Sequence, residues 1–213
     1  MNAPPFGPRR ELIPTVGALD PVHAEAFAAA LTAGGVRYLE ILLRDPQAWQ
    51  LLDAMTSVPG IRVGAGTILD ADGARRARDA GAAFLVSPGL DVDLANAIRS
   101  LDIPYIPGVA TASDLMRARG AGLHHVKVFP AEQIGGSAAL SALSAPFPDM
   151  QFMPSGGVDE SRLTAYCALS QVFAVGGSWL IDAASLATGD FSDVTSKACS
   201  AVAIISGSEP RGE

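Results

Sequence analysis

The sequence predicts the α/β fold class and, within it, a single-domain (β/α)8 TIM barrel. Eight short apolar runs recur along the chain, and each is followed by a stretch rich in Ala and Leu that suits a helix. Uninterrupted apolar strands are typical of a parallel sheet covered by helices. Because eight such units fill a chain of 213 residues, a closed barrel is favoured. An open doubly wound sheet is the alternative.

The predicted strands are short, and each is bounded by Gly or Pro, which end extended segments. In chain order they cover residues 12–17, 37–43, 61–66, 83–88, 104–109, 125–130, 151–156 and 172–177.

The predicted helices lie between these strands. Most begin at an Asp, Ser or Thr that can cap the first turn, and several end at Gly. In order they occupy residues 20–35, 45–60, 70–82, 91–100, 111–122, 135–148 and 159–170, and the last helix lies within residues 181–207.

The whole chain, residues 1–213, is predicted to form one domain, because no linker-like segment divides it. Residues 1–10 and 206–213 are expected to be flexible tails. The first segment is interrupted by prolines and lacks the apolar stretch of a signal peptide.

The charge and composition exclude several classes of protein. A net charge of −7 and a pI near 4.9 argue against a nucleic-acid partner. The apolar runs are too short to span a bilayer, so no membrane partner is expected and a cytoplasmic protein is predicted. Cys167 and Cys199 lack the spacing of a metal site, and the adjacent His124 and His125 would point to opposite faces of a strand. We therefore expect neither a metal nor a cofactor.

Two ionisable residues stand inside apolar predicted strands. Lys127 lies in HHVKVFPAE and Glu40 in RYLEILLR, where an unpaired charge is costly. A lysine must lose its proton to attack a carbonyl, and apolar surroundings with a nearby cation favour the neutral amine. Lys127 therefore suits Schiff-base formation, with Glu40 carrying protons. A structural ion pair between the two residues is the alternative.

Arg44 comes four residues after Glu40, which places it on the same side of the strand, at or just past its end. Its planar guanidinium matches a carboxylate, so it could hold the acid group of an oxo acid, helped by the Thr67 hydroxyl. The alternative is a surface arginine that pairs with Asp45.

Two glycine pairs follow the last two predicted strands and indicate an anion site. The loops at these two positions often bind phosphate in such barrels, because glycines let backbone N–H groups point into a concavity. A single glycine pair often marks only a turn. The candidate residues are Ser155, Gly156, Gly157, Gly176, Gly177 and Ser178.

Taken in order, seven motifs resemble the bacterial 2-keto-3-deoxy-6-phosphogluconate (KDPG) aldolases, which also act as 4-hydroxy-2-oxoglutarate aldolases. The motifs are LEILLR, VGAGTIL, FLVSPG, IPGVAT, VKVFPAE, PSGGV and VGGSWL, and the resemblance extends over residues 13–190. It implies that Lys127 forms the Schiff base with pyruvate and that Glu40 is the acid/base. It also implies that Arg44 and Thr67 bind the pyruvate carboxylate.

The same resemblance implies phosphate contacts in the SGG and GGSW segments, and Pro88 and Phe129 as pocket residues. It further implies a homotrimer and class I chemistry without a metal. Two positions differ from the family pattern: LRT is LRD here, and TGG is SGG. The first change places the charge of Asp45 beside the carboxylate-binding arginine, which would weaken binding of an anionic substrate.

The predicted function is that of a class I aldolase acting on a small-molecule 2-oxo acid. It would reversibly cleave KDPG or 4-hydroxy-2-oxoglutarate to pyruvate and an aldehyde, either glyceraldehyde 3-phosphate or glyoxylate. Two alternatives remain: a non-catalytic barrel that binds a sugar phosphate, and an aldolase specific for another 2-keto-3-deoxy sugar acid. A sugar-phosphate isomerase would share the phosphate loops, but it needs facing acid/base groups or metal ligands that the strand ends do not supply.

Overall fold

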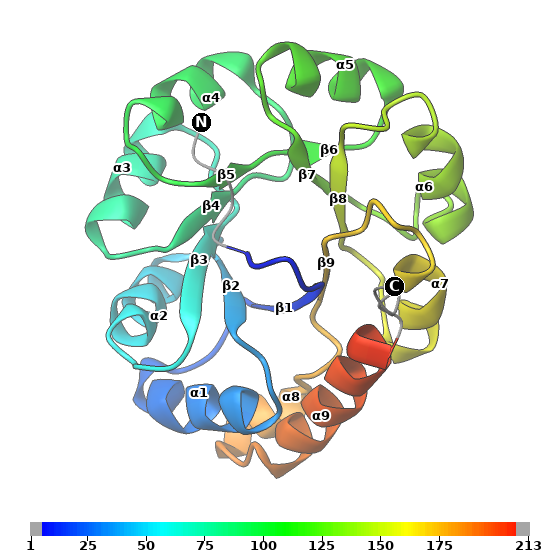
Figure 1. The fold of residues 1–213 in the computed structure, drawn as a ribbon. Coiled ribbons are helices and arrows are strands. Elements are labelled where there is room, and N and C mark those ends of the chain that lie inside the picture. Colours follow the sequence, from blue (N-terminus) through cyan, green and yellow to red (C-terminus); the bar gives the residue numbers. More distant parts are fainter. Residues whose placement is uncertain (1–5, 208–213) are drawn as a thin grey trace.

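The computed structural model describes residues 6–207 as an α/β fold with two parallel sheets. The larger sheet has the strand order β5-β4-β3-β2-β1-β9 and the smaller the order β6-β7-β8. Figure 1 shows the strands curving around a common interior, with the helices outside them. The strands are β1 (Glu11–Val16), β2 (Tyr38–Leu42), β3 (Arg62–Gly66), β4 (Phe84–Val86), β5 (Tyr105–Ile106), β6 (Gly108–Val109), β7 (His125–Val128), β8 (Gln151–Pro154) and β9 (Ala174–Gly177).

The helices alternate with the strands, as the sequence predicts. Asp45, Asp70, Asp91 and Asp182 each cap a helix by accepting a backbone N–H, and Thr111 forms a capping box with its N3 residue. The α-helices are α1 (Ala24–Ala33), α2 (Pro46–Thr56), α3 (Ala71–Asp79), α4 (Val92–Arg99), α5 (Ala112–Gly120), α6 (Gly136–Ser144), α7 (Leu163–Cys167), α8 (Ala183–Thr188) and α9 (Ser192–Gly207), with short 3-10 turns η1 (Pro21–His23) and η2 (Glu160–Arg162).

The fifth predicted strand is divided into β5 and β6, because Pro107 interrupts it. Proline has no N–H to donate to a ladder. The first half pairs with β4 and the second half with β7, so one extended segment joins the edges of both sheets. At the other edges, Phe152 of β8 forms a parallel bridge with Val172, just before β9. The N–H of Phe173 also donates to the Phe152 carbonyl at 3.1 Å.

The last predicted helix is two helices, α8 and α9. Gly189 separates them with a φ of 71°, a conformation that favours glycine and ends α8. Asp190 then accepts the N–H of Ser192 at the start of α9. α9 continues to Gly207, so residues 206 and 207, predicted to belong to a flexible tail, are helical, while residues 208–213 lie outside the described residues.

The first predicted tail is also partly ordered. The Phe6 ring lies 4.8 Å from that of Tyr38 and 5.5 Å from that of Phe84, measured between centroids. Arg10 donates from Nε to the Val172 carbonyl at 2.8 Å. These contacts place Phe6 and Arg10 against the rest of the chain, where the sequence predicts a flexible tail, and the aromatic side chain fills space at one end of the interior. Residues 1–5 lie outside the described part of the chain.

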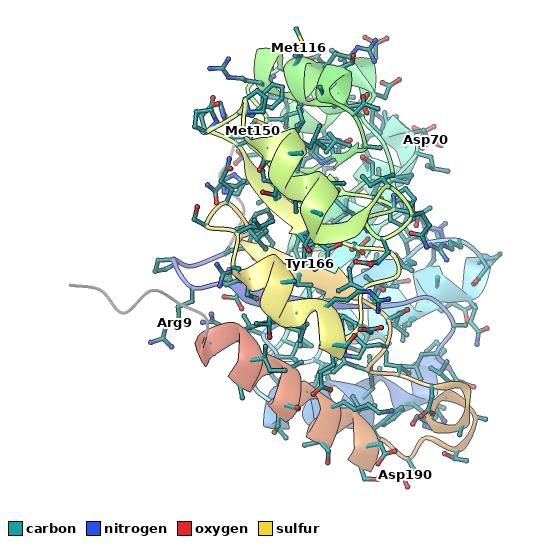
Figure 2. The ribbon with its side chains drawn as sticks, turned by 90° about the vertical axis from the view of Figure 1, so that its right-hand side faces the viewer. Arg9, Asp70, Met116, Met150, Tyr166 and Asp190 are labelled. Atoms are coloured by element: carbon teal, nitrogen blue, oxygen red, sulfur yellow. The ribbon has the colours of Figure 1, made fainter. Side chains whose placement is uncertain are left out.

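The strands divide their side chains between two cores. An outer cluster lies between the sheets and the helices, and a smaller inner cluster contains Ile13, Tyr38, Phe84, Val86, Ile106, Met153 and Ala174. Figure 2 shows the molecule from the side: Arg9 and Met150, which precede strands, lie toward one end, and Asp70, which follows β3, lies toward the other. Polar groups that follow the strands therefore gather at one end. No helix within residues 6–207 is long and apolar enough to cross a membrane.

Candidate active site

A cavity of about 400 Å³ lies at the carboxyl ends of β1, β2, β7, β8 and β9. Most of the site residues predicted from the sequence line it, although they come from distant parts of the chain. The lining residues are Thr15, Gly17, Ala18, Leu42, Arg44, Asp45, Lys127, Phe129, Ser155, Gly156, Gly157, Gly177 and Ser178.

Lys127 and Glu40 meet in the interior, although β7 and β2 are not neighbours in either sheet. The lysine Nζ lies 2.8 Å from Oε1 and 3.0 Å from Oε2 of the glutamate. Their side chains are only 6% and 0% exposed, so charge-assisted hydrogen bonds hold the pair in a low-dielectric environment. The Phe129 ring also lies near this nitrogen, with its centroid 5.4 Å away. The geometry fits a structural ion pair and equally an amine beside its proton acceptor.

The Glu40 carboxylate is fully buried and does not line the cavity itself, whereas Lys127, which it contacts, does. It lies against Gly66 of β3: a Cβ atom added there would stand 2.2 Å from Glu40 Oε1 and 2.7 Å from its Cγ. Only a residue without a side chain leaves room for the carboxylate in this position. Sequence reasoning missed Gly66, since a glycine in a strand shows no chemistry of its own.

Arg44 follows β2 and lines the cavity. Within residues 6–207 its guanidinium forms no ion pair with an acidic side chain, so the surface pair with Asp45 is not what the structure contains. Asp45 instead caps α2, accepting the Ala48 N–H at 2.9 Å. The guanidinium is therefore available to an anionic ligand.

The loops after β8 and β9 present backbone donors to the cavity. Gly156 and Gly157 have φ values of 93° and 77°, which favour glycine. In the described part of the chain, the N–H groups of Gly156, Gly157 and Ser178 donate to no other protein group. A Cβ atom at Gly177 would collide with the Trp179 ring at 2.1 Å. These glycines let unpaired N–H groups face one concavity, an arrangement that suits an anion.

A partly buried hydrogen-bond network behind the β8 loop was not predicted. Glu132 accepts hydrogen bonds from Arg162 Nε at 2.8 Å and from the Tyr166 hydroxyl at 2.6 Å. Its N–H donates to the Gly156 carbonyl at 3.1 Å. Burial raises the pKa of Tyr166, and the hydrogen bond to the Glu132 carboxylate raises it further, so the phenol stays a donor. Glu132 was visible in the VFPAE motif, but its partners lie about thirty positions away and no local signal joins them.

Besides Glu40, three predicted site residues do not lie on the cavity wall. Thr67 follows β3 with a φ of 63°, which is rare for a β-branched residue. Pro88 lies against the backbone of Gly108. A Cβ atom added at Gly108 would stand 2.2 Å from the Pro88 carbonyl. Gly176 lies next to Ser155. A Cβ atom added at Gly176 would stand 3.1 Å from the Ser155 Oγ. Gly176 makes room for Ser155, and the contacts of Thr67 and Pro88 with a substrate stay predictions.

Other polar groups near the strand ends are already engaged. The Ser87 hydroxyl lies 2.6 Å from the Tyr105 hydroxyl and donates to the Gly89 carbonyl, also at 2.6 Å. Burial raises the pKa of Tyr105 to about 12, so this phenol stays neutral near pH 7. Within residues 6–207, no group of three or more His, Cys, Asp or Glu side chains could hold a metal ion.

Comparison with known proteins places the chain in a family. A family model described as KDPG and KHG aldolase matches residues 9–197. The chain is 42% identical to the KHG/KDPG aldolase of Escherichia coli K12 over 200 residues, which cover 90% of this chain and 94% of that protein. The chain belongs to the KDPG and KHG aldolase family.

Solved structures of family members share the fold. The KDPG aldolase of Zymomonas mobilis ZM4, determined with 3-phosphoglycerate, is 37% identical with a TM-score of 0.87, and the match covers 92% of each chain. The KDPG aldolase of Legionella pneumophila is 35% identical with a TM-score of 0.85, covering 90% of this chain and 94% of that one. In the latter structure, pyruvate was captured at low pH as a covalent carbinolamine intermediate.

Proposed function

We propose that this chain is a class I aldolase that reversibly cleaves a 4-hydroxy-2-oxo acid into pyruvate and an aldehyde. The observation that carries the proposal is the buried Lys127 amine on the cavity wall, 2.8 Å from a Glu40 oxygen. A carbinolamine, the species captured with pyruvate in the Legionella relative, joins a carbonyl carbon to an amine nitrogen. The only other lysine, Lys197, bonds to Asp182 on the surface.

Lys127 and Glu40 act in successive steps of the proposed reaction. Lys127 passes a proton to Glu40, and the neutral nitrogen attacks the C2 carbonyl to form a carbinolamine. Glu40 returns this proton to the carbinolamine hydroxyl, which leaves as water, so that an iminium ion forms and Glu40 is again a carboxylate. Removal of the C4 hydroxyl proton breaks the C3–C4 bond, and its electron pair moves into the C2–C3 bond as the iminium becomes an enamine. Glu40, acting through a water, accepts that proton. Protonation of C3 and hydrolysis then release pyruvate.

KDPG is the proposed substrate, with 4-hydroxy-2-oxoglutarate as a second one. Arg44 would hold the carboxylate of the oxo acid with a bidentate fork, helped by the Thr67 hydroxyl. The free N–H groups of Gly156, Gly157 and Ser178 would hold the phosphate, with the Ser155 and Ser178 hydroxyls. Phe129 and Pro88 would line the space for the carbon chain. Glyceraldehyde 3-phosphate or glyoxylate is then the aldehyde product.

The same proposal includes a closed (β/α)8 barrel. β5 and β6 join the two sheets at one seam, and the Phe152–Val172 bridge joins them at the other. A homotrimer in the cytoplasm completes it; light scattering that gave the mass of a monomer would contradict the trimer. Cys167 and Cys199 are free thiols, which fits a reducing compartment.

Trapping with borohydride tests the reaction. Added with pyruvate, it should leave a covalent adduct on Lys127, located by peptide mass spectrometry, while the Lys197→Ala control is trapped normally. Lys127→Ala should abolish cleavage, but it strands a buried carboxylate, which can cost about 3–5 kcal/mol. Lys127→Arg keeps the cation and cannot form an imine, so it should fold and be inactive. An adduct on Lys197, or cleavage that survives in Lys127→Arg and needs a divalent ion, would contradict the proposal.

A further inference from the structure

Thr15 is a cavity residue to which neither the motifs nor the comparisons assign a role. It lies near the end of β1, and its side chain faces the interior: Ile13, two residues earlier, belongs to the inner cluster, whereas Leu12 and Val16 belong to the outer one. The residue is 6% exposed, and it lines the same cavity as Lys127.

The register of β1 fixes the neighbours of Thr15. On one side it pairs with Glu40 of β2, whose carboxylate holds the Lys127 amine. On the other side, Pro14 pairs with Gly177 of β9, so Thr15 stands beside the start of the Gly177–Ser178 segment. Thr15 therefore lies between the amine and its acceptor on one side and the proposed phosphate donors on the other.

The Thr15 hydroxyl has no structural task in the described part of the chain. Within residues 6–207 it makes no hydrogen bond with another group, and it is not among the fully enclosed unpaired atoms. A valine would fill the same space in a strand, and burying a hydroxyl without a partner is unfavourable. A hydroxyl that faces the cavity without a protein partner is available to a ligand.

We infer that the Thr15 hydroxyl binds the hydroxylated middle of the substrate, at the C4 hydroxyl group, and so contributes to the preference for 4-hydroxy-2-oxo acids. This inference rests on the proposed function. With C2 at Lys127, the carboxylate at Arg44 just after β2, and the phosphate at the β8 and β9 loops, the carbon chain crosses the cavity in front of β1. Thr15 is the polar side chain that β1 contributes to the cavity wall.

The test compares Thr15→Val, which removes the hydroxyl at nearly constant shape, with Thr15→Ser, which keeps the hydroxyl and removes the methyl group. Two reactions are measured for each variant and for the unsubstituted enzyme. Exchange of the pyruvate methyl protons in D2O reports imine and enamine formation, in which no C4 hydroxyl takes part. Cleavage of KDPG requires the C4 hydroxyl.

We expect Thr15→Val to exchange pyruvate protons at the normal rate but to cleave KDPG with kcat/KM lower by roughly tenfold, the loss of one neutral hydrogen bond. Thr15→Ser should keep both rates, and the melting temperature of Thr15→Val should not fall. Unchanged cleavage by Thr15→Val, or an equal loss of exchange and cleavage, overturns the inference. If the unsubstituted enzyme neither exchanges protons nor forms the borohydride adduct, the proposed function fails, and this inference fails with it.

Discussion

At the scale of single residues, the Lys127–Glu40 pair depends on Gly66, because the absence of a side chain there leaves room for the Glu40 carboxylate. The Glu40 carboxylate occupies the volume that a side chain at Gly66 would fill. Because the clashing atoms belong to the end of a flexible side chain, an alanine there can be accommodated if Glu40 turns away. Such a turn would break its hydrogen bonds to Lys127.

Gly66→Ala should therefore fold but lose catalysis. We expect kcat to fall by about a hundredfold or more, the usual contribution of a positioned acid/base group, with a smaller change in KM. The matched control is Gly89→Ala, because an added Cβ atom there meets nothing within 4 Å. Steady-state kinetics and thermal melts of both variants check the prediction. If Gly66→Ala keeps its full kcat, the position of Glu40 is not critical.

Single residues were predictable from the sequence where their chemistry conflicts with their surroundings. Lys127 and Glu40 are charges in apolar strands, so burial costs made both conspicuous. Thr15 and Gly66 gave no such signal, because threonine is common in strands and glycine has no side chain. Their importance depends on register with β2 and β3, which only the assembled sheet defines.

At the scale of the elements, the sequence located the strands within a few residues, because Gly and Pro mark their ends. It did not show that Pro107 divides the fifth strand between two sheets, or that Gly189 divides the last helix. The division at Pro107 depends on pairing with strands distant in sequence, and the division at Gly189 depends on a left-handed backbone conformation. The sequence also left the partner of the Asp45 side chain ambiguous. In the structure this side chain is the N-cap of α2.

Asp45 thus combines a cap with a charge on the cavity wall, and the two roles can be separated. Asp45→Ser keeps an acceptor of similar capping strength and removes the charge, so stability should change by less than about 0.5 kcal/mol. KM for KDPG should fall several-fold at low salt, and the gain should shrink as added salt screens the charge. Urea unfolding and kinetics at two ionic strengths measure these effects.

The matched variant is Asp45→Ala, which removes both the charge and the cap. It should show the same lower KM but lose about 1 kcal/mol of stability, the usual cost of an N-cap. If KM is unchanged in both variants, the Asp45 charge does not act on the bound anion. If Asp45→Ser is as unstable as Asp45→Ala, the cap requires a carboxylate.

At the scale of the whole molecule, the interior is arranged in layers from one end to the other. The cavity and the Lys127–Glu40 pair lie where the strands end, and the inner apolar cluster follows beneath them. At the far end, Phe6 contacts Tyr38, Phe84 and Phe173. Through its apolar strands, the sequence predicted a parallel sheet covered by helices. It could not predict the role of Phe6, since a lone aromatic residue among prolines resembles a tail.

Phe6 should therefore matter for stability and not for chemistry. Phe6→Ala removes a half-buried ring from three aromatic contacts, and a loss of about 1–3 kcal/mol is expected, below the range for a fully buried phenylalanine. Phe6→Leu refills most of that volume and should lose less. Because the inner cluster separates this ring from Lys127, kcat and the yield of the pyruvate adduct should stay unchanged in both variants.

Urea unfolding of Phe6→Ala, Phe6→Leu and the unsubstituted protein at one protein concentration gives the comparison. Equal stability of Phe6→Ala and the unsubstituted protein would mean that the segment behaves as a detached tail in solution, and a lower kcat at unchanged stability would mean that the two ends of the interior are coupled.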